Sequence, residues 1–115
     1  MKLVKKADWS PQKRRTYFRY KIFSQEDIGQ EGCVFQIVMF KREQEILKHH
    51  HKGMTEIYII LSGHGAITIN NVMMKCEKND VLLIEKGEWH SIKNNGDQDF
   101  TIAICKFNFD DTFIW

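Results

Sequence analysis

The chain has 115 residues, of which 43% are hydrophobic and 28% charged, and its formal net charge is +2. This size and balance are typical of one globular domain, so we expect a single domain over residues 1–115. No apolar run approaches the roughly 20 residues of a membrane helix, and no apolar stretch follows the basic N-terminus as in a secretory signal. We therefore expect no membrane partner and a cytoplasmic location.

Positive charge is concentrated at the N-terminus. Residues 1–21 contain eight Lys or Arg side chains against the single acid Asp8, whereas the remainder has nine basic and fourteen acidic residues. We interpret residues 1–16 as an irregular basic arm that is solvated or docks on an acidic partner subunit. A nucleic-acid role is the weaker alternative, because no recognisable reading motif accompanies the charge, and nucleic acid is not expected as a partner.

Short strand-like runs follow the arm and are separated by turn residues every ten or so positions. Residues 17–23 form an aromatic run, and residues 24–32, polar with two glycines, predict a loop. The later runs are residues 33–41, 56–61, 66–69, 72–76, 81–84, 89–93 and 100–107. Between two of them, Asn70 and Asn71 predict a tight hairpin, because asparagine tolerates positive φ.

Helical signals are weak along the chain. No segment keeps a 3.6-residue apolar period, and residues 41–48 are too short and too polar to form a core helix. Many short strands with regular turns are typical of a sandwich or barrel. The pattern alone therefore predicts an all-β fold.

The three cysteines, Cys33, Cys76 and Cys105, are widely spaced, and no CxxC pair occurs. An odd and scattered set does not predict a disulfide framework or a structural zinc site built on thiolates. We interpret these residues as buried structural thiols, because free cysteine is commonly buried.

Three consecutive histidines make residues 49–51 the most informative stretch. On an extended strand, residues two apart point to the same face, so His49 and His51 project together and His50 projects away. A slip of one residue in register would reverse this assignment. On residue types alone, a chance exposed cluster remains an alternative to a pair of metal ligands.

Two later residues could complete a metal site with His49 and His51. After a turn at residues 52–55, the chain can return with Glu56 on an adjacent strand, and a barrel can bring His90 opposite. Three imidazoles and one carboxylate suit a single divalent ion such as Fe, Mn, Ni, Zn or Cu. This ligand set leaves a position open to water or substrate, as metal-assisted chemistry requires.

The spacing of these residues resembles the two sequence motifs of the cupin superfamily. The first motif reads G-x5-HxH-x4-E-x6-G, and the second reads G-x5-PxG-xx-H-xxx-N. The matching positions are His49, His51, Glu56 and Gly63 in the first motif and Gly87, His90 and Asn94 in the second. The resemblance covers residues 33–107, with every ligand position intact.

Three turn positions depart from the two motifs. Glu43 and Asn79 stand where each motif begins with glycine, and Glu85 replaces the proline of the second motif. These losses affect turn chemistry rather than the ligand set, and an Asn-Asp pair can still make the second turn.

The resemblance implies a double-stranded β-helix, or jelly-roll cupin barrel, over residues 33–107, with a pocket at the barrel mouth. It also implies frequent dimerisation, often through an exchanged N-terminal strand, so we expect a homodimer. Residues 17–23 are the candidate for that strand, and an ordinary edge strand within one subunit is the equal alternative. The apolar tail, residues 108–115, should pack on the barrel or across a dimer interface.

Inward-facing residues should line the pocket. Glu56, Tyr58 and Ile60 alternate on one strand, and we name Glu56 and Tyr58 as candidate catalytic residues. Glu56 could serve as a base, whereas Tyr58 could hydrogen-bond a substrate or simply pack as a buried aromatic. Trp89 could shield the metal or cap the rim.

Glycine flanks the remaining histidine on both sides. We interpret Gly63 and Gly65 as turn glycines that supply backbone freedom. His64 between them is then a surface turn residue rather than a fifth ligand.

Our first function hypothesis is a metal-dependent enzyme, dioxygenase-like or isomerase-like, that acts on a small organic molecule. The three-His, one-Glu set resembles that of oxalate- and quercetin-degrading cupins and of acireductone dioxygenase. The alternative is a non-catalytic module that binds or senses a sugar or an organic acid. Fold alone does not separate the two, because one fold hosts many functions.

Overall fold

The computed structural model describes residues 1–109, so residues 110–115 of the expected apolar tail lie outside the described chain. The strands are β1 (Gln12–Lys13), β2 (Phe18–Phe23), β3 (Val34–Phe40), β4 (Glu45–His49), β5 (Thr55–Ser62), β6 (His64–Ile69), β7 (Val72–Glu77), β8 (Val81–Ile84), β9 (His90–Lys93) and β10 (Phe100–Phe107). Two short helical turns accompany them, η1 (Lys6–Asp8) and α1 (Gln25–Ile28). Neither helix is long and apolar enough to span a membrane.

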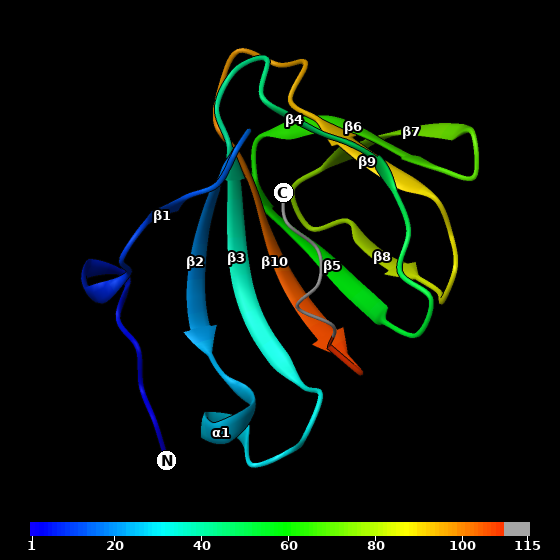
Figure 1. Ribbon diagram of the computed structural model, residues 1–115. Coiled ribbons are helices and arrows are strands. Elements are labelled where there is room, and N and C mark those ends of the chain that lie inside the picture. Colours follow the sequence, from blue (N-terminus) through cyan, green and yellow to red (C-terminus); the bar gives the residue numbers. More distant parts are fainter. Residues whose placement is uncertain (110–115) are drawn as a thin grey trace.

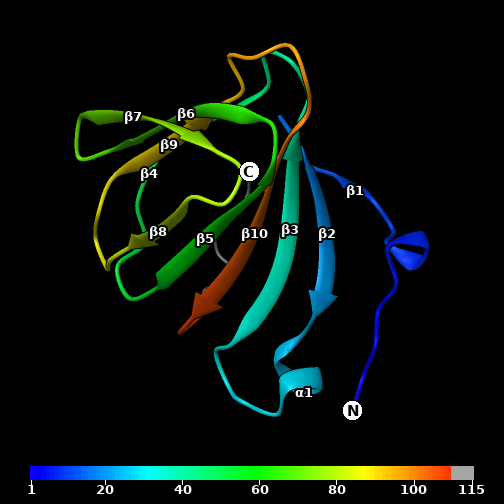
Figure 2. The same cartoon turned by 180° about the vertical axis from the view of Figure 1, so that it is seen from behind.

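Two antiparallel sheets face each other across the core (Figure 1). The larger sheet has the order β1-β2-β3-β10-β5-β8, and the smaller has the order β4-β9-β6-β7. Figure 2 shows the same pair from behind, with the N-terminal arm running beside β2 at the edge of the larger sheet. This arrangement confirms the predicted all-β jelly roll.

Alternation along the strands separates the core from the surface. Strand β10 lies between β3 and β5, and its Ile102 and Ile104 are level with Ile60 and Tyr58 of β5. Residues of the same parity on neighbouring strands point to one face, so they build one buried layer. The core residues are Tyr17, Val38, Phe40, Ile46, Tyr58, Ile60, Ile67, Cys76, Ile84, Ile92, Phe100, Ile102 and Ile104.

Positive-φ residues close the turns as the motifs require. Glu43 and Asn79, which replace the motif glycines, have φ of 68° and 77°. The left-handed backbone of those turns is therefore kept without glycine, although the conformation is less favourable for a side chain. Asn70 and Asn71, with φ of 48° and 69°, form the predicted hairpin between β6 and β7.

Residues 41–48, unassigned from the sequence, contain most of strand β4. Ile46 is buried and pairs with Ile92 of β9, which anchors the strand to the smaller sheet. A single inward apolar residue is enough here because the neighbouring strand supplies the hydrogen bonds. This strand carries His49 at its C-terminal end.

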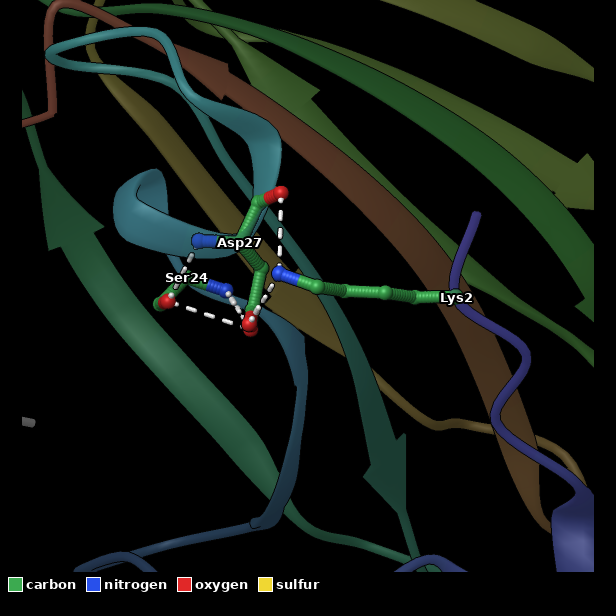
Figure 3. Close-up of polar contacts among 3 residues, drawn as sticks. All are labelled: Lys2, Ser24 and Asp27. Carbon is green, nitrogen blue, oxygen red and sulfur yellow. Dashed lines mark hydrogen bonds and ion pairs between the residues drawn. The ribbon is translucent and has the colours of Figure 1, made fainter.

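The predicted loop at residues 24–32 contains the helical turn α1. The backbone N–H of Asp27 donates to Ser24 Oγ, and the Asp27 carboxylate accepts from the Ser24 backbone, which forms a capping box. Lys2 Nζ lies 3.2 Å from Asp27 Oδ1, so the start of the basic arm folds back onto α1 (Figure 3).

The prediction that Gly65 is a turn glycine is wrong. Gly65 lies inside β6 and pairs with Cys76 of β7. A Cβ atom at this position would lie 2.5 Å from the Phe100 ring, so glycine is needed for close packing rather than for a turn. Gly63, with φ of +74°, is the turn residue as expected. The prediction that His64 is a surface turn residue is wrong, because His64 is the half-buried first residue of β6.

Residues 17–23 supply strand β2, which pairs with β3 of the same chain. On its other side β2 pairs with the short β1, so the basic arm is part of the larger sheet at this point. Within the described chain, this segment therefore pairs on both sides with strands of its own chain.

The cysteines follow the predicted burial only in part. Cys76 is buried in the core, whereas Cys33 and Cys105 are half-buried. Burial raises the pKa of the Cys76 and Cys105 thiols. Both thiols are therefore kept protonated and unreactive, as structural cysteines are.

Candidate metal centre

Three imidazoles meet between the two sheets. The coordinating atoms of His49, His51 and His90 all lie within 4.8 Å of one another. Pairing of β4 with β9 sets His49 directly opposite His90, and their ring centroids are 4.2 Å apart. His50 points elsewhere and packs against Trp89, with the ring centroids 4.1 Å apart, as the strand alternation predicts.

Glu56 approaches the histidines from the facing sheet. It is the second residue of β5, and its Oε1 atom lies 3.3 Å from His90 Nε2 and 3.9 Å from His51 Nε2. The structure therefore brings together the four residues that the motifs singled out as ligands. Their side chains come from two strands of the smaller sheet, one strand of the larger sheet and the segment that joins β4 to β5.

Backbone carbonyls hold two of the imidazoles in place. His49 Nδ1 lies 2.8 Å from the Leu47 oxygen, and His90 Nδ1 lies 2.9 Å from the Glu88 oxygen. Each contact favours the tautomer with its proton on Nδ1, which leaves the Nε2 lone pair for the interior. Metal-ligating histidines are commonly supported in this way.

The donor atoms fit a divalent ion. Glu56 Oε1 and His90 Nε2 are fully buried, and within residues 1–109 neither atom has a hydrogen-bond partner. Buried polar atoms are rarely left unpaired, so these two atoms indicate that a further group, such as a cation, binds beside them. Ligand atoms about 2.1 Å from an ion lie roughly 3.0–3.4 Å from one another, which agrees with the 3.3 Å between these two atoms. The cluster could therefore hold a metal ion.

The charge states also suit a metal. Burial, reinforced by the charge of His90, lowers the pKa of His49 from 6.5 to about 4, so this imidazole is neutral near pH 7. Burial raises the pKa of Glu56, but His90, Lys106 and His51 together outweigh it and leave that pKa below its usual value. The site therefore offers a neutral imidazole and an ionised carboxylate.

A small cavity of about 20 Å³ adjoins the cluster. That volume holds roughly one water molecule. Besides the histidines and apolar core residues, its polar lining consists of Tyr17, Gln36, Glu56, Tyr58 and Lys106. Sequence reasoning missed Gln36 and Lys106, although each has the same parity as the inward residues of its strand, Val38 and Ile104 respectively.

Tyr58 lies where the sequence placed it. It is 2% exposed, faces inward beside Glu56 and lines the cavity. Burial, with a contribution from the Glu56 charge, raises its pKa well above 10, so the phenol keeps its proton and can act as a donor. Trp89 is 42% exposed on the rim against His50, away from the cavity lining.

Comparison with known protein families finds a match to the cupin domain over residues 36–105. Among curated proteins, the "Oxalate-binding protein" of Thermotoga maritima is 31% identical over 78 residues, which cover 68% of this chain and 64% of that protein. An "Uncharacterized protein" of Methanocaldococcus jannaschii is 34% identical over 61 residues, or 53% of this chain and 49% of that protein. The matched region is less than two thirds of the length of either relative.

Solved structures share the fold at lower identity. A "predicted oxalate decarboxylase" from Thermotoga maritima superposes with a TM-score of 0.86 and 23% identity, covering 92% of this chain and 98% of that chain. The polyketide cyclase RemF from Streptomyces resistomycificus superposes with a TM-score of 0.84 and 14% identity, covering 100% and 87%. The structural likeness shows the fold, and the family match spans more than half of the sequence. This chain belongs to the cupin family.

Proposed function

We propose that this chain is a metal-dependent cupin that binds a small oxygen-bearing organic ligand. One divalent ion would be held by His49, His51, Glu56 and His90. The observation that carries the proposal is the buried pair of Glu56 Oε1 and His90 Nε2, 3.3 Å apart and without a hydrogen-bond partner in residues 1–109. A shared cation would compensate both atoms at once.

The ion, when bound, would act as a Lewis acid toward a ligand oxygen. The chain's own residues would position that oxygen and exclude water. Tyr58 lines the cavity with its proton retained, so it would donate a hydrogen bond to the ligand. The buried side chains of Ile46 and Ile92 border the same cavity and would keep bulk water out.

The ligand that we would test first is oxalate. One relative is named for binding oxalate, and the cavity beside the histidines is small. A two-carbon acid places the least demand on that space. Larger substrates such as flavonoids would require the walls of the cavity to move apart.

Metal content tests the proposal directly. Untagged protein, purified without a nickel column, would be analysed by inductively coupled plasma mass spectrometry. We expect near-stoichiometric metal in the wild type, loss of metal in His51→Ala, and full metal in the matched control His50→Ala, because the His50 ring packs against Trp89 instead. A wild type that takes up no divalent ion, even after reconstitution, would overturn the proposal.

Catalysis is the second candidate, favoured by the buried and protonated Tyr58 at the cavity wall. Under this second candidate function, the chain is a dioxygenase-like oxidoreductase or an isomerase, with Glu56 and Tyr58 as candidate catalytic residues. Metal-loaded protein would be assayed for turnover of small acids, enediols and flavonoids. Turnover that falls in Tyr58→Phe at unchanged metal content would support it, whereas binding without turnover leaves the sensing or storage module.

We also propose the homodimer and the cytoplasmic location that the sequence predicts. Support for the dimer comes from exposed apolar side chains on the outward face of β5 and β8. These residues are Leu61, Val81 and Leu83. Light scattering coupled to size-exclusion chromatography would give the mass in solution, and a monomer would overturn the dimer.

A further inference from the structure

A buried lysine lies beside the proposed metal site. Lys106 is 8% exposed on the inward face of β10, and the strand register sets it directly opposite Glu56 of β5. Lysine is rarely this buried unless its charge is compensated. Glu56 directs its Oε1 toward His90 and His51, and among residues 1–109 no ion pair joins it to Lys106. Burial lowers the pKa of Lys106 and the Glu56 charge raises it, but the ammonium is not held in an ion pair with that carboxylate, so its N–H donors can bind a ligand.

The small cavity that Lys106 lines shares one lining residue with a larger cavity. Lys106 lines the cavity of about 20 Å³ beside the histidines, together with Gln36. Gln36 also lines a larger cavity of about 250 Å³, as does Phe109. The Lys106 Nζ atom lies 5.4 Å from the centre of the Phe109 ring. The Lys106 ammonium therefore lies in the wall of the small cavity and close to the wall of the larger one.

Positive charge would be in excess around a loaded site. A divalent ion and Lys106 contribute positive charge, and Glu56 is the acidic side chain that lines the small cavity. Burial is the largest influence on the pKa of Lys106 and lowers it, and the charges of Arg19 and Arg14 lower it further. A cleft in which one sign of charge is in excess attracts a ligand of the opposite charge.

On the basis of the proposed metal-dependent function, we infer that this site selects small organic dianions. One carboxylate would bind the ion, and the second would accept a charge-assisted hydrogen bond from the Lys106 ammonium. The lysine is then a specificity-determining residue, because a ligand without the second negative charge leaves the ammonium uncompensated. Among dicarboxylates, oxalate needs the least enlargement of the small cavity, which holds about one water molecule as it stands.

The test compares three ligands of nearly equal shape and decreasing charge, namely oxalate, oxamate and oxamide. Isothermal titration calorimetry would be carried out on metal-loaded wild type, Lys106→Met, Lys106→Arg and the control Lys75→Met, which removes an exposed lysine from β7. We expect wild type to prefer oxalate over oxamate by about tenfold or more, as one charged hydrogen bond would give. Lys106→Met should lose this preference, whereas Lys106→Arg and Lys75→Met should keep it.

Metal content, measured on every sample, separates the two proposals. A metal-loaded wild type that binds oxalate and oxamide equally would overturn the selection for dianions and leave the metal site standing. So would a folded, metal-loaded Lys106→Met that keeps the oxalate preference. A wild type without metal overturns the proposed function instead. Should Lys106→Met fail to fold, the ligand series on wild type together with Lys106→Arg decides the question.

Discussion

Glu56 Oε1 lies 3.3 Å from His90 Nε2, although the two residues belong to different sheets. Glu56 is carried by β5 of the larger sheet and His90 by β9 of the smaller one. The contact therefore spans the interior and does not follow from strand pairing. It exists only when the two sheets are packed, so the candidate site is a property of the complete fold.

Replacing Glu56 by glutamine tests the carboxylate ligand. The substitution keeps the shape of the side chain but removes its charge, so we expect divalent-metal affinity to fall by about tenfold or more. Competition with a chromogenic chelator would measure the affinity. Glu45→Gln, which removes an exposed carboxylate from β4, is the matched control and should bind metal like wild type. Equal affinity in Glu56→Gln would exclude the carboxylate as a ligand.

The metal-free protein should lose stability as the pH falls. Burial lowers the pKa of His49 to about 4, while the unfolded chain has the ordinary value of 6.5. Between these values the unfolded chain binds a proton that the folded chain does not, so falling pH favours unfolding. Thermal unfolding in the presence of a chelator, from neutral pH to about pH 4, would follow this loss. His49→Gln should flatten the profile, and a profile unchanged from that of His50→Gln would contradict the assignment.

Asn94, the last residue of the second motif, should matter for stability rather than for the metal. It is fully buried; its Nδ2 donates to the Phe40 and Gln98 carbonyls, and its Oδ1 accepts from the Gly96 N–H. Losing three such bonds in Asn94→Ala should lower the free energy of unfolding by about 2–4 kcal/mol. Urea unfolding would show this at unchanged metal content. The exposed neighbour offers the control Asn95→Ala, and equal stability of the two variants would be evidence against this role.

Gly65→Ala should destabilise the protein through packing alone. The added Cβ atom would lie 2.5 Å from the Phe100 ring and 2.8 Å from the Lys93 carbonyl oxygen. Overpacking of this kind costs about 1–3 kcal/mol of unfolding free energy. Ala66→Ser on the same strand points away from the core and should change stability by less than about 0.5 kcal/mol. A Gly65→Ala protein as stable as wild type would mean that the Phe100 ring moves freely.

The sequence was sufficient for the parts of the fold that follow from local periodicity. Alternation placed His49 and His51 on one face, and the paired asparagines at 70 and 71 predicted the hairpin. Strand β10 was predicted with its observed ends, because most of its residues are apolar, including the inward-facing Ile102 and Ile104. The two motifs then supplied Glu56 and His90, which no local pattern connects to the histidine pair.

Features that depend on residues far apart in the chain could not be predicted. Gly65 is required by Phe100, which is distant in sequence and close only after the sheets pack. Strand β4 has a single buried apolar residue, Ile46, so no alternation of apolar and polar residues marks it as a strand. Lys106 points inward like Ile104 and Ile102, which lie two and four residues before it. From sequence alone, a charged residue near the end of a strand is expected to be solvated.

Because the candidate ligands come from both sheets, metal binding should affect local unfolding of the protein and its resistance to proteolysis. An ion bound there would act as a staple at one end of the sandwich, tying β5 to β9 where no backbone hydrogen bonds join them. Without the staple, amide protons near that end should exchange sooner than those at the centre of β10, and proteases would gain access there first. The amount of intact protein in a cell would then rise and fall with the supply of its metal.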